Sequence, residues 1–359
     1  MNTIPGYQIP FTGLQRQYKN LREEILDATD AVLASGQIMN GPNTFLFEQA
    51  LASKNNVKHA VTCHSGTQAL EIIASFARQR TGINPPTVVI PSMTFPASAN
   101  AFVRAGWNIY FADTDAYGNM DVNKVVRTQT YQAVLGIGLY GSALPKHIWY
   151  QTGLIEDAAQ HWLSDNCKRY GIGAAISFDP MKNLGNYGNG GAVVTDDQEL
   201  HNYALGWRDN GKSTGHAEIG TNSRMSEVDC AQLLVKIKYL SAWQIVRRNI
   251  AHYWMGKFKD SPVRCLIDNT NVDTHCFHKF VVEIDNRDDV LKKMQAKGID
   301  VKVHYAHPLH ELPAYQHYRG PDMLSAASSL SRRCLSLPIY PELTDVEVEY
   351  IASSLLDCV

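Results

Sequence analysis

The sequence carries little net charge and lacks long apolar runs. Its 33 Lys and Arg residues nearly balance 35 Asp and Glu residues, which leaves a formal net charge of -2. A general attraction to nucleic acid or to an anionic lipid surface needs a basic surplus. A membrane-spanning helix needs about 20 mostly apolar residues, and no stretch provides them. We therefore expect neither nucleic acid nor a membrane among the partners.

A secretory leader and the common metal sites are missing too. Met1 to Tyr7 contain no basic region followed by an apolar segment, so we expect a protein of the cytoplasm. The 7 cysteines are scattered and odd in number, and among 13 His residues there is no His-Glu-x-x-His pattern. We expect no metal ion, and reduced thiols at the cysteines. These are Cys63, Cys167, Cys230, Cys265, Cys276, Cys334 and Cys358.

What the sequence does contain is the patterning of a globular α/β protein. Its 359 residues are enough for about two domains. Residues 17–33 place Leu21 and Ile25 at helical spacing, and further helices are expected over 43–54 and from Thr67 onward. Short apolar runs then recur at 88–90, 109–111, 133–137, 154–155, 174–178 and 192–194. Such runs are typical of a mostly parallel sheet covered on both faces, with ligands beyond the carboxyl ends of its strands.

A long helical pattern over 228–258 is expected to connect this sheet to a smaller α+β domain. That domain has predicted strands at 276–284 and 301–305, a helix at 287–296, and a final helix that Thr344 caps. The sequence therefore predicts a large domain over 1–240 and a small C-terminal domain over 241–359.

The most informative segment runs from Ser177 to Ala192. Lys182 follows a predicted buried strand and precedes a turn with four glycines. A lysine amine becomes a nucleophile toward carbonyl groups only where its surroundings lower its pKa, and the end of a buried strand can provide that. On this segment alone, a solvated lysine before a hairpin remains the alternative.

A carboxylate and an amide follow another predicted strand. Asp157 can hold the protonated ring nitrogen of pyridoxal phosphate, and Gln160 can donate a hydrogen bond to the ring hydroxyl. The alternative for Asp157 is a carboxylate that caps a helix.

Three further features suit the same cofactor. Ser65-Gly66-Thr67 stands before a predicted helix, whose free amides and dipole can hold a phosphate, and Ser177 can add a hydroxyl. Phe95 follows the strand at 88–90 and can stack on a pyridine ring. Each feature alone is more often a plain helix cap or a core aromatic.

In this order, the features make the chain resemble the DegT/StrS-type sugar aminotransferases, which are pyridoxal phosphate (PLP) enzymes of fold type I. The resemblance runs nearly end to end. Its most specific motifs are Ser65-Gly66-Thr67-Gln68-Ala69-Leu70, Pro91-Ser92-Met93-Thr94-Phe95, Glu156-Asp157-Ala158-Ala159-Gln160, the segment Ser177 to Gly191, Gly220-Thr221-Asn222-Ser223-Arg224 and Val303-His304-Tyr305-Ala306-His307-Pro308-Leu309-His310.

The resemblance implies a role for each site residue. Lys182 carries the cofactor as a Schiff base and moves the proton, while Asp157 pairs with the ring nitrogen. The other implied cofactor contacts are Gln160 at the ring hydroxyl, Phe95 over the ring face, Ser65, Gly66, Thr67 and Ser177 at the phosphate, and Asn222 at the phosphate of the neighbouring subunit. The implied neighbours of the sugar or nucleotide are His304, Tyr305 and His310.

The implied reaction transfers an amino group, by family habit from L-glutamate, to a keto-deoxy-sugar that is linked to a nucleotide. The implied assembly is a homodimer with shared active sites. The chain departs from the family at Asp179-Pro180-Met181, usually a tyrosine or histidine and then Pro-Ser, and at Asn189, usually an aspartate. Two alternatives stay open. One is a PLP-dependent sugar dehydratase, although such enzymes carry a histidine in place of Lys182, and the other is a non-catalytic regulatory protein of the same fold.

Overall fold

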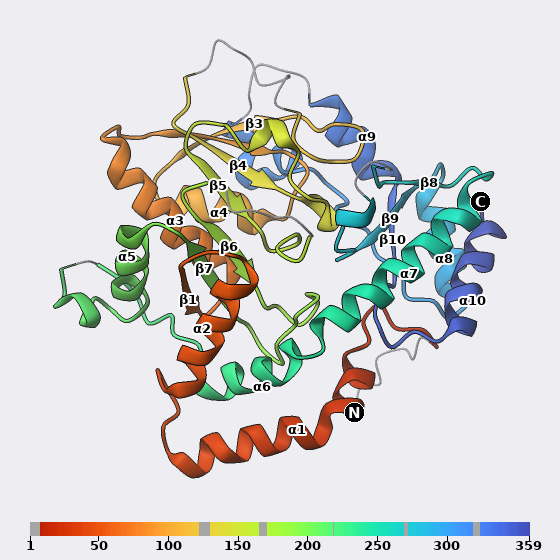
Figure 1. The fold of residues 1–359 in the computed structure, drawn as a ribbon. Coiled ribbons are helices and arrows are strands. Elements are labelled where there is room, and N and C mark those ends of the chain that lie inside the picture. Colours follow the sequence, from red (N-terminus) through yellow and green to blue (C-terminus); the bar gives the residue numbers. More distant parts are fainter. Residues whose placement is uncertain (1–7, 122–129, 165–170, 218, 269–271, 319–323) are drawn as a thin grey trace.

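The computed structural model describes residues 8–121, 130–164, 171–217, 219–268, 272–318 and 324–359 (Figure 1). Cys167 and the segment 1–7, on which two of the sequence predictions rest, lie outside these ranges. Within the ranges, no helix is both long enough and apolar enough to cross a membrane.

A seven-stranded sheet forms the centre of the larger part of the molecule, with the strand order β1-β7-β6-β5-β4-β2-β3. Its strands are β1 (His59–Cys63), β2 (Thr87–Pro91), β3 (Asn108–Ala112), β4 (Ala133–Ile137), β5 (Leu154–Asp157), β6 (Ala174–Ser177) and β7 (Gly191–Thr195). The pairs from β6 to β3 are parallel, and β7 runs antiparallel to both of its neighbours. The mostly parallel α/β sheet that the apolar runs predicted is therefore confirmed.

Helices cover both faces of this sheet (Figure 1). They are α2 (Pro42–Lys54), α3 (Gly66–Thr81), α4 (Pro96–Arg104), α5 (Gln198–Arg208) and α6 (Glu227–Ile237), and α1 (Leu14–Ser35) packs against the outer side of α6. Val193 of β7 lies in the core cluster that includes side chains of α3 and α5, whereas its neighbours Ala192 and Val194 lie in the cluster that includes side chains of α2 and α6. Because both faces are buried, the strands are apolar at successive positions and not only at alternate ones.

A smaller region carries the second sheet, which is antiparallel and has the order β10-β9-β8. Its elements are α7 (Leu240–Phe258), β8 (Arg264–Cys265), β9 (Phe280–Glu283), α8 (Arg287–Ala296), α9 (Ser325–Arg333), β10 (Cys334–Leu337) and α10 (Asp345–Leu356). Short 3-10 helices lie at Leu139–Gly141, Lys146–Ile148, Lys212–Thr214, Val272–Thr274, Leu309–Glu311 and Pro313–Tyr318. Thr344 caps α10 as predicted, in a capping box with Glu347.

Two segments cross the predicted division between the domains. Ile9 packs in the core of the smaller region, and Leu309, Tyr315 and Leu324 pack in the core beneath α3. A boundary at residue 240 therefore stays a prediction.

Three predicted elements differ from the structure. The helix expected over 228–258 is two helices, because the amide of Tyr239 bonds the carbonyl of Lys236, three residues back, and interrupts the α-helical ladder. The strand expected at 276–284 begins only at Phe280, since Phe277 has a φ of 45°. The strand expected at 301–305 is reduced to one bridge between Lys302 and Ser336.

Candidate active site

A cavity of about 370 Å³ lies beyond the carboxyl ends of β5 and β6 and next to the first residues of α3. The structure brings ten of the twelve predicted site residues to its wall. They are Ser65, Gly66, Thr67, Phe95, Asp157, Gln160, Ser177, Lys182, His304 and Tyr305. Residues from chain positions 65 to 305 thus meet at the place where a parallel sheet collects its ligands.

The start of α3 forms one end of the cavity. The hydroxyl oxygen of Ser65 accepts a hydrogen bond of 3.2 Å from the amide of Gln68, so this side chain is a helix N-cap, as the plain capping alternative held. The amides of Gly66 and Thr67 belong to the first helical turn, where the backbone lacks intrahelical acceptors. Together with the helix dipole they suit an anion such as a phosphate.

Two glycines allow this end of the cavity to form. A Cβ atom at Gly66 would lie 2.7 Å from Cβ of Ser177, and one at Gly191 would lie 2.3 Å from the carbonyl carbon of Ser65. Gly191 is the last glycine of the glycine-rich turn and pairs with Cys63 at the end of β1. The turn therefore serves close approach between β7 and the helix start.

We expect a Gly66→Ala substitution to weaken cofactor binding at least about tenfold. The added methyl group forces the helix start away from Ser177, and overpacking of this kind costs about 1–3 kcal/mol. Titration of the apoenzyme with PLP, followed by absorbance, measures the effect. Gly256→Ala is the matched control, because a Cβ atom there meets nothing within 4 Å. Equal affinities in the two variants would contradict this placement of the phosphate.

Asp157 is held in a fixed orientation at the end of β5. Its side chain is buried, with one oxygen accepting from the hydroxyl of Ser98 at 2.7 Å and the other from the amide of Ala159 at 3.2 Å. Ser98 lies on α4 and contacts Thr94 at 3.1 Å. The contact with Ala159 is local, but among the described residues no helix begins at Asp157, so the helix-cap alternative is wrong and the carboxylate faces the cavity.

The amide of Gln160 presents a donor to the cavity. Its oxygen accepts from the backbone N–H of Tyr140 at 2.9 Å, which fixes the flip of the amide group. Its nitrogen then lies 3.3 Å from the hydroxyl oxygen of Tyr305. A donor at this point suits the hydroxyl oxygen of a pyridine ring.

Lys182 is the buried amine of the site. It follows β6 in a tight turn, in which its amide donates to the carbonyl of Asp179 at 2.8 Å. Burial lowers the pKa of its ammonium, while the charges of Asp157 and Asp179 act in the opposite direction. A lowered pKa increases the neutral, nucleophilic fraction of the amine, which is what the sequence predicted.

The turn after Lys182 is fixed from two sides. Asn183 donates to Gln244 at 2.9 Å and to the carbonyl of Cys276 at 2.7 Å. The buried ammonium of Lys236 donates to the carbonyl of Gly185 at 2.7 Å. These bonds connect the turn to α6, to α7 and to the segment before β9. The backbone at Lys182, from which the side chain extends into the cavity, is therefore held in place.

Aromatic and histidine side chains close the remaining wall. Phe95 is 55% exposed at the start of α4, with its ring centroid 6.0 Å from that of Tyr305. His304 contacts the hydroxyl of Ser336 at 2.9 Å, and burial lowers the pKa of its ring to about 3. The imidazole is therefore neutral near pH 7, and it can orient a sugar hydroxyl without adding charge.

Two predicted residues do not line this cavity. His310 is buried behind it, where its ring contacts the hydroxyl of Ser92 at 2.6 Å. Asn222 is exposed, and its oxygen accepts from Arg224 at 3.2 Å. Their predicted roles toward the sugar and toward a neighbouring subunit stay predictions.

Sequence reasoning missed some residues that the structure places here. Asp179, His278 and Lys279 also line the cavity, although Asp179 had been noted as a departure from the family pattern. Lys279 and Glu283 are the two charged residues of the largely apolar segment 276–284, and a charge in such a segment is the signal that could have found Lys279.

The cavity fits a phosphorylated pyridine aldehyde. It offers helix amides for the phosphate, a buried carboxylate for the ring nitrogen, an amide donor for the ring hydroxyl and a buried amine for the aldehyde. Asp157 and Lys182 line the same cavity, and the charge of Asp157 raises the pKa of Lys182. An acid and an amine on one cavity wall are the pair that PLP chemistry needs.

Comparisons with known proteins agree with this geometry. The model of the DegT/DnrJ/EryC1/StrS aminotransferase family matches residues 19–356. A dTDP-3-amino-3,4,6-trideoxy-alpha-D-glucose transaminase from Streptomyces venezuelae is 34% identical over 354 residues, which cover 94% of this chain and 92% of the relative. A pleiotropic regulatory protein from Geobacillus stearothermophilus is 30% identical over 368 residues, which cover 97% and 98%. The solved structure of S. venezuelae DesV in complex with a ketimine intermediate superimposes with a TM-score of 0.89 at 31% identity, covering 99% of this chain and 98% of that one.

Proposed function

Because the chain belongs to the DegT/DnrJ/EryC1/StrS aminotransferase family, we propose that it moves an amino group from L-glutamate to the keto group of a nucleotide-linked deoxy-sugar. The protein is a PLP-dependent sugar aminotransferase of fold type I. When bound, the cofactor would supply an aldehyde carbon that can carry the amino group between the two half-reactions and a ring that acts as an electron sink. The proposal concerns the identity of the amino donor, L-glutamate, and the linkage of the sugar to a nucleotide.

One observation carries the assignment of roles: Lys182 and Asp157 meet in a cavity whose far end is the start of α3. Lys182 holds the cofactor covalently and carries the proton at the reacting carbon. Asp157, fixed by Ser98, keeps the ring nitrogen protonated. Gln160 donates to the ring hydroxyl, Phe95 covers the ring, and His304 and Tyr305 face the sugar.

Incubation of the purified protein with L-glutamate tests this function. We expect the absorbance of enzyme-bound PLP to fall and one equivalent of 2-oxoglutarate to appear. An unchanged spectrum with several amino donors would overturn the proposal.

A regulatory role is the second candidate, because one relative is named a pleiotropic regulatory protein. A protein that only senses a ligand has no need of a buried amine beside a fixed carboxylate, and this chain keeps both. The lysine also speaks against a dehydratase, since those family members carry a histidine at its position.

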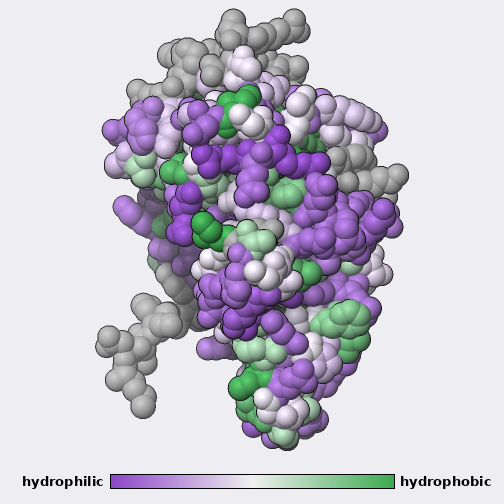
Figure 2. All heavy atoms as spheres, turned by 90° about the vertical axis from the view of Figure 1, so that its left-hand side faces the viewer, coloured by the Kyte–Doolittle hydropathy of each residue, from purple (hydrophilic) through white to green (hydrophobic). Residues whose placement is uncertain are grey.

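We further propose that the protein works as a homodimer in the cytoplasm. Ile38, Met39, Phe45 and Leu46, around the start of α2, are each 38–59% exposed, and clustered exposed apolar side chains favour an interface. Figure 2 views the molecule from the left-hand side of Figure 1. Apolar residues are visible there toward the lower end, at the level of α1 and α2 in Figure 1. The six described cysteines are free thiols, which suits a reducing compartment.

Light scattering on the purified protein measures its assembly. We expect a particle of twice the chain mass of 40.0 kDa. A particle of one chain mass that is active in the glutamate assay would contradict an active site shared between subunits.

A further inference from the structure

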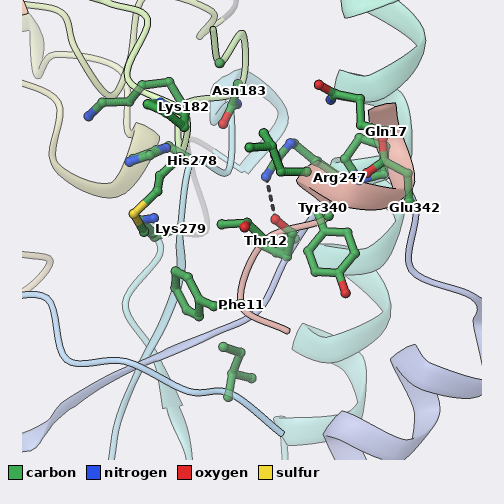
Figure 3. Close-up of a pocket in the computed structure, with 18 residues that line it drawn as sticks. Phe11, Thr12, Gln17, Lys182, Asn183, Arg247, His278, Lys279, Tyr340 and Glu342 are labelled. Carbon is green, nitrogen blue, oxygen red and sulfur yellow. Dashed lines mark hydrogen bonds between the residues drawn. The ribbon is translucent and has the colours of Figure 1, made fainter. Parts of the chain in front are cut away.

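The cavity holds a second buried lysine, for which the proposed roles have no use. Lys279 stands one residue before β9, and its amide donates to the carbonyl of Tyr140 at 3.0 Å, which anchors it to the larger part of the molecule. The residue is only 5% exposed, yet it lines both the large cavity and a smaller adjoining pocket. Figure 3 shows its side chain on the same side of that pocket as those of Lys182 and His278.

The ammonium of Lys279 has no acidic partner at ion-pair distance among the described residues. The ammonium lies over the face of the Phe11 ring, with 4.7 Å between Nζ and the ring centroid. Asp179 attracts it from a distance, but that carboxylate is partly exposed and accepts from the amide of Met181 at 2.9 Å. A buried ammonium with so little compensation is expensive, and a fold keeps one where a ligand brings the opposite charge.

Burial and neighbouring basic groups both act on the amine of Lys279. Burial lowers the pKa of its ammonium well below the usual value, and the charges of Lys182 and Arg247 lower it further. His278 and His304 lie in the same wall, and burial lowers the pKa of each ring, so these rings are neutral neighbours. The amine of Lys279 therefore binds a proton weakly in the empty site, and an anion that arrives with the substrate would favour its protonated form.

The other buried cation nearby is already engaged. Arg247 donates to the carbonyl groups of Phe277 at 3.1 Å and Ile339 at 2.7 Å. It lines the adjoining pocket, whose volume is about 30 Å³, and does not line the large cavity. Among the described lysines and arginines, those that line the large cavity are Lys182 and Lys279, and the cofactor occupies Lys182.

We propose that Lys279 binds the α-carboxylate of the amino donor and thereby selects α-amino acids for the first half-reaction. This inference rests on the proposed function. In an α-amino acid the carboxylate is bonded to the same carbon as the reacting amine, so it must lie close to Lys182. A keto-sugar presents a neutral carbon substituent at that place. Lys279 therefore determines specificity for the donor. Its ammonium has a partner of opposite charge only while the donor carboxylate is bound.

The test compares two donors that differ only in this charge. L-Glutamate and isoglutamine, its α-carboxamide, are titrated into the wild-type holoenzyme and into a Lys279→Met variant, and absorbance gives the dissociation constants. We expect the substitution to raise the dissociation constant of L-glutamate at least about thirtyfold, because truncating one partner of a buried charge pair costs about 2 kcal/mol or more. For isoglutamine we expect the dissociation constant to change by less than about threefold. Lys279→Arg should recover part of the loss, and Lys292→Met, on the exposed side of α8, is the control for a lost charge.

A second readout does not need the reaction. Replacing a poorly compensated buried ammonium by an apolar side chain of similar length should raise the thermal midpoint of the holoenzyme without substrates, by about 2 °C or more. A lower midpoint would mean that Lys279 serves the fold and would overturn the inference. Equal losses for both donors, or a loss confined to the sugar half-reaction, would overturn it as well. A wild-type enzyme that responds to neither donor would instead overturn the proposed function itself.

Discussion

A Lys182→Ala enzyme is expected to release 2-oxoglutarate from L-glutamate at least about 10³-fold more slowly than the wild type. The side chain has two tasks, because it holds the cofactor covalently and moves a proton at the reacting carbon. The substitution removes both tasks together. The phosphate end of the cavity at Gly66 and Thr67 is untouched, so we expect the variant to retain PLP noncovalently.

Two comparisons make this result specific. Lys279→Met removes the other lysine of the same cavity. It should weaken binding of the donor without abolishing the single turnover at saturating L-glutamate. Lys292→Met changes an exposed lysine of α8 and should behave as the wild type. A Lys182→Ala enzyme that turns over within about tenfold of the wild type would show that another group does this chemistry.

An Asp157→Asn substitution is expected to slow the donor half-reaction by about 10²–10³-fold, the usual cost of removing one preorganised electrostatic contact. Asparagine keeps the size of the side chain and can still accept from the hydroxyl of Ser98, so the geometry should persist. What disappears is the negative charge that keeps the ring nitrogen protonated. The charge of Asp157 also raises the pKa of Lys182, so its removal should lower that pKa further.

Rapid-mixing absorbance with L-glutamate measures this rate across a pH series. Ser98→Ala is the matched control: it removes one hydrogen bond of the carboxylate but keeps the charge, and it should cost no more than about tenfold. If Asp157→Asn slowed the donor half-reaction no more than Ser98→Ala does, the carboxylate of Asp157 would have only a structural role.

The sheet was predictable because its strands are buried on both faces and therefore read as plain apolar runs. β1 was missed, since polar residues at positions 59 and 62 leave His59–Cys63 with an apolar run of only two residues, which is too short to stand out beside the helices around it. The break between α6 and α7 was missed for a different reason. One turn with a bond over three residues, at Tyr239, leaves the helical spacing of apolar side chains nearly unchanged.

The site was predictable where its residues stand at strand ends and helix starts, as Asp157, Lys182 and Thr67 do. Parallel strands bring such positions together whatever the loops do. The C-terminal segment offers no such rule. His304 and His310 stand close in sequence, yet one lines the cavity and the other turns back to Ser92, because loop geometry decides the direction of each side chain. Lys279 escaped because its neighbours mark the segment as core.

Reduction of the holoenzyme with borohydride, followed by digestion and mass spectrometry of the peptides, tests the central claim most directly. Reduction makes the bond between the cofactor and its lysine permanent, so the labelled residue identifies the reactive amine. The account predicts a pyridoxyl phosphate label on Lys182 and the loss of that label in Lys182→Ala. A label on Lys279, or none on an enzyme that has PLP bound, would contradict it.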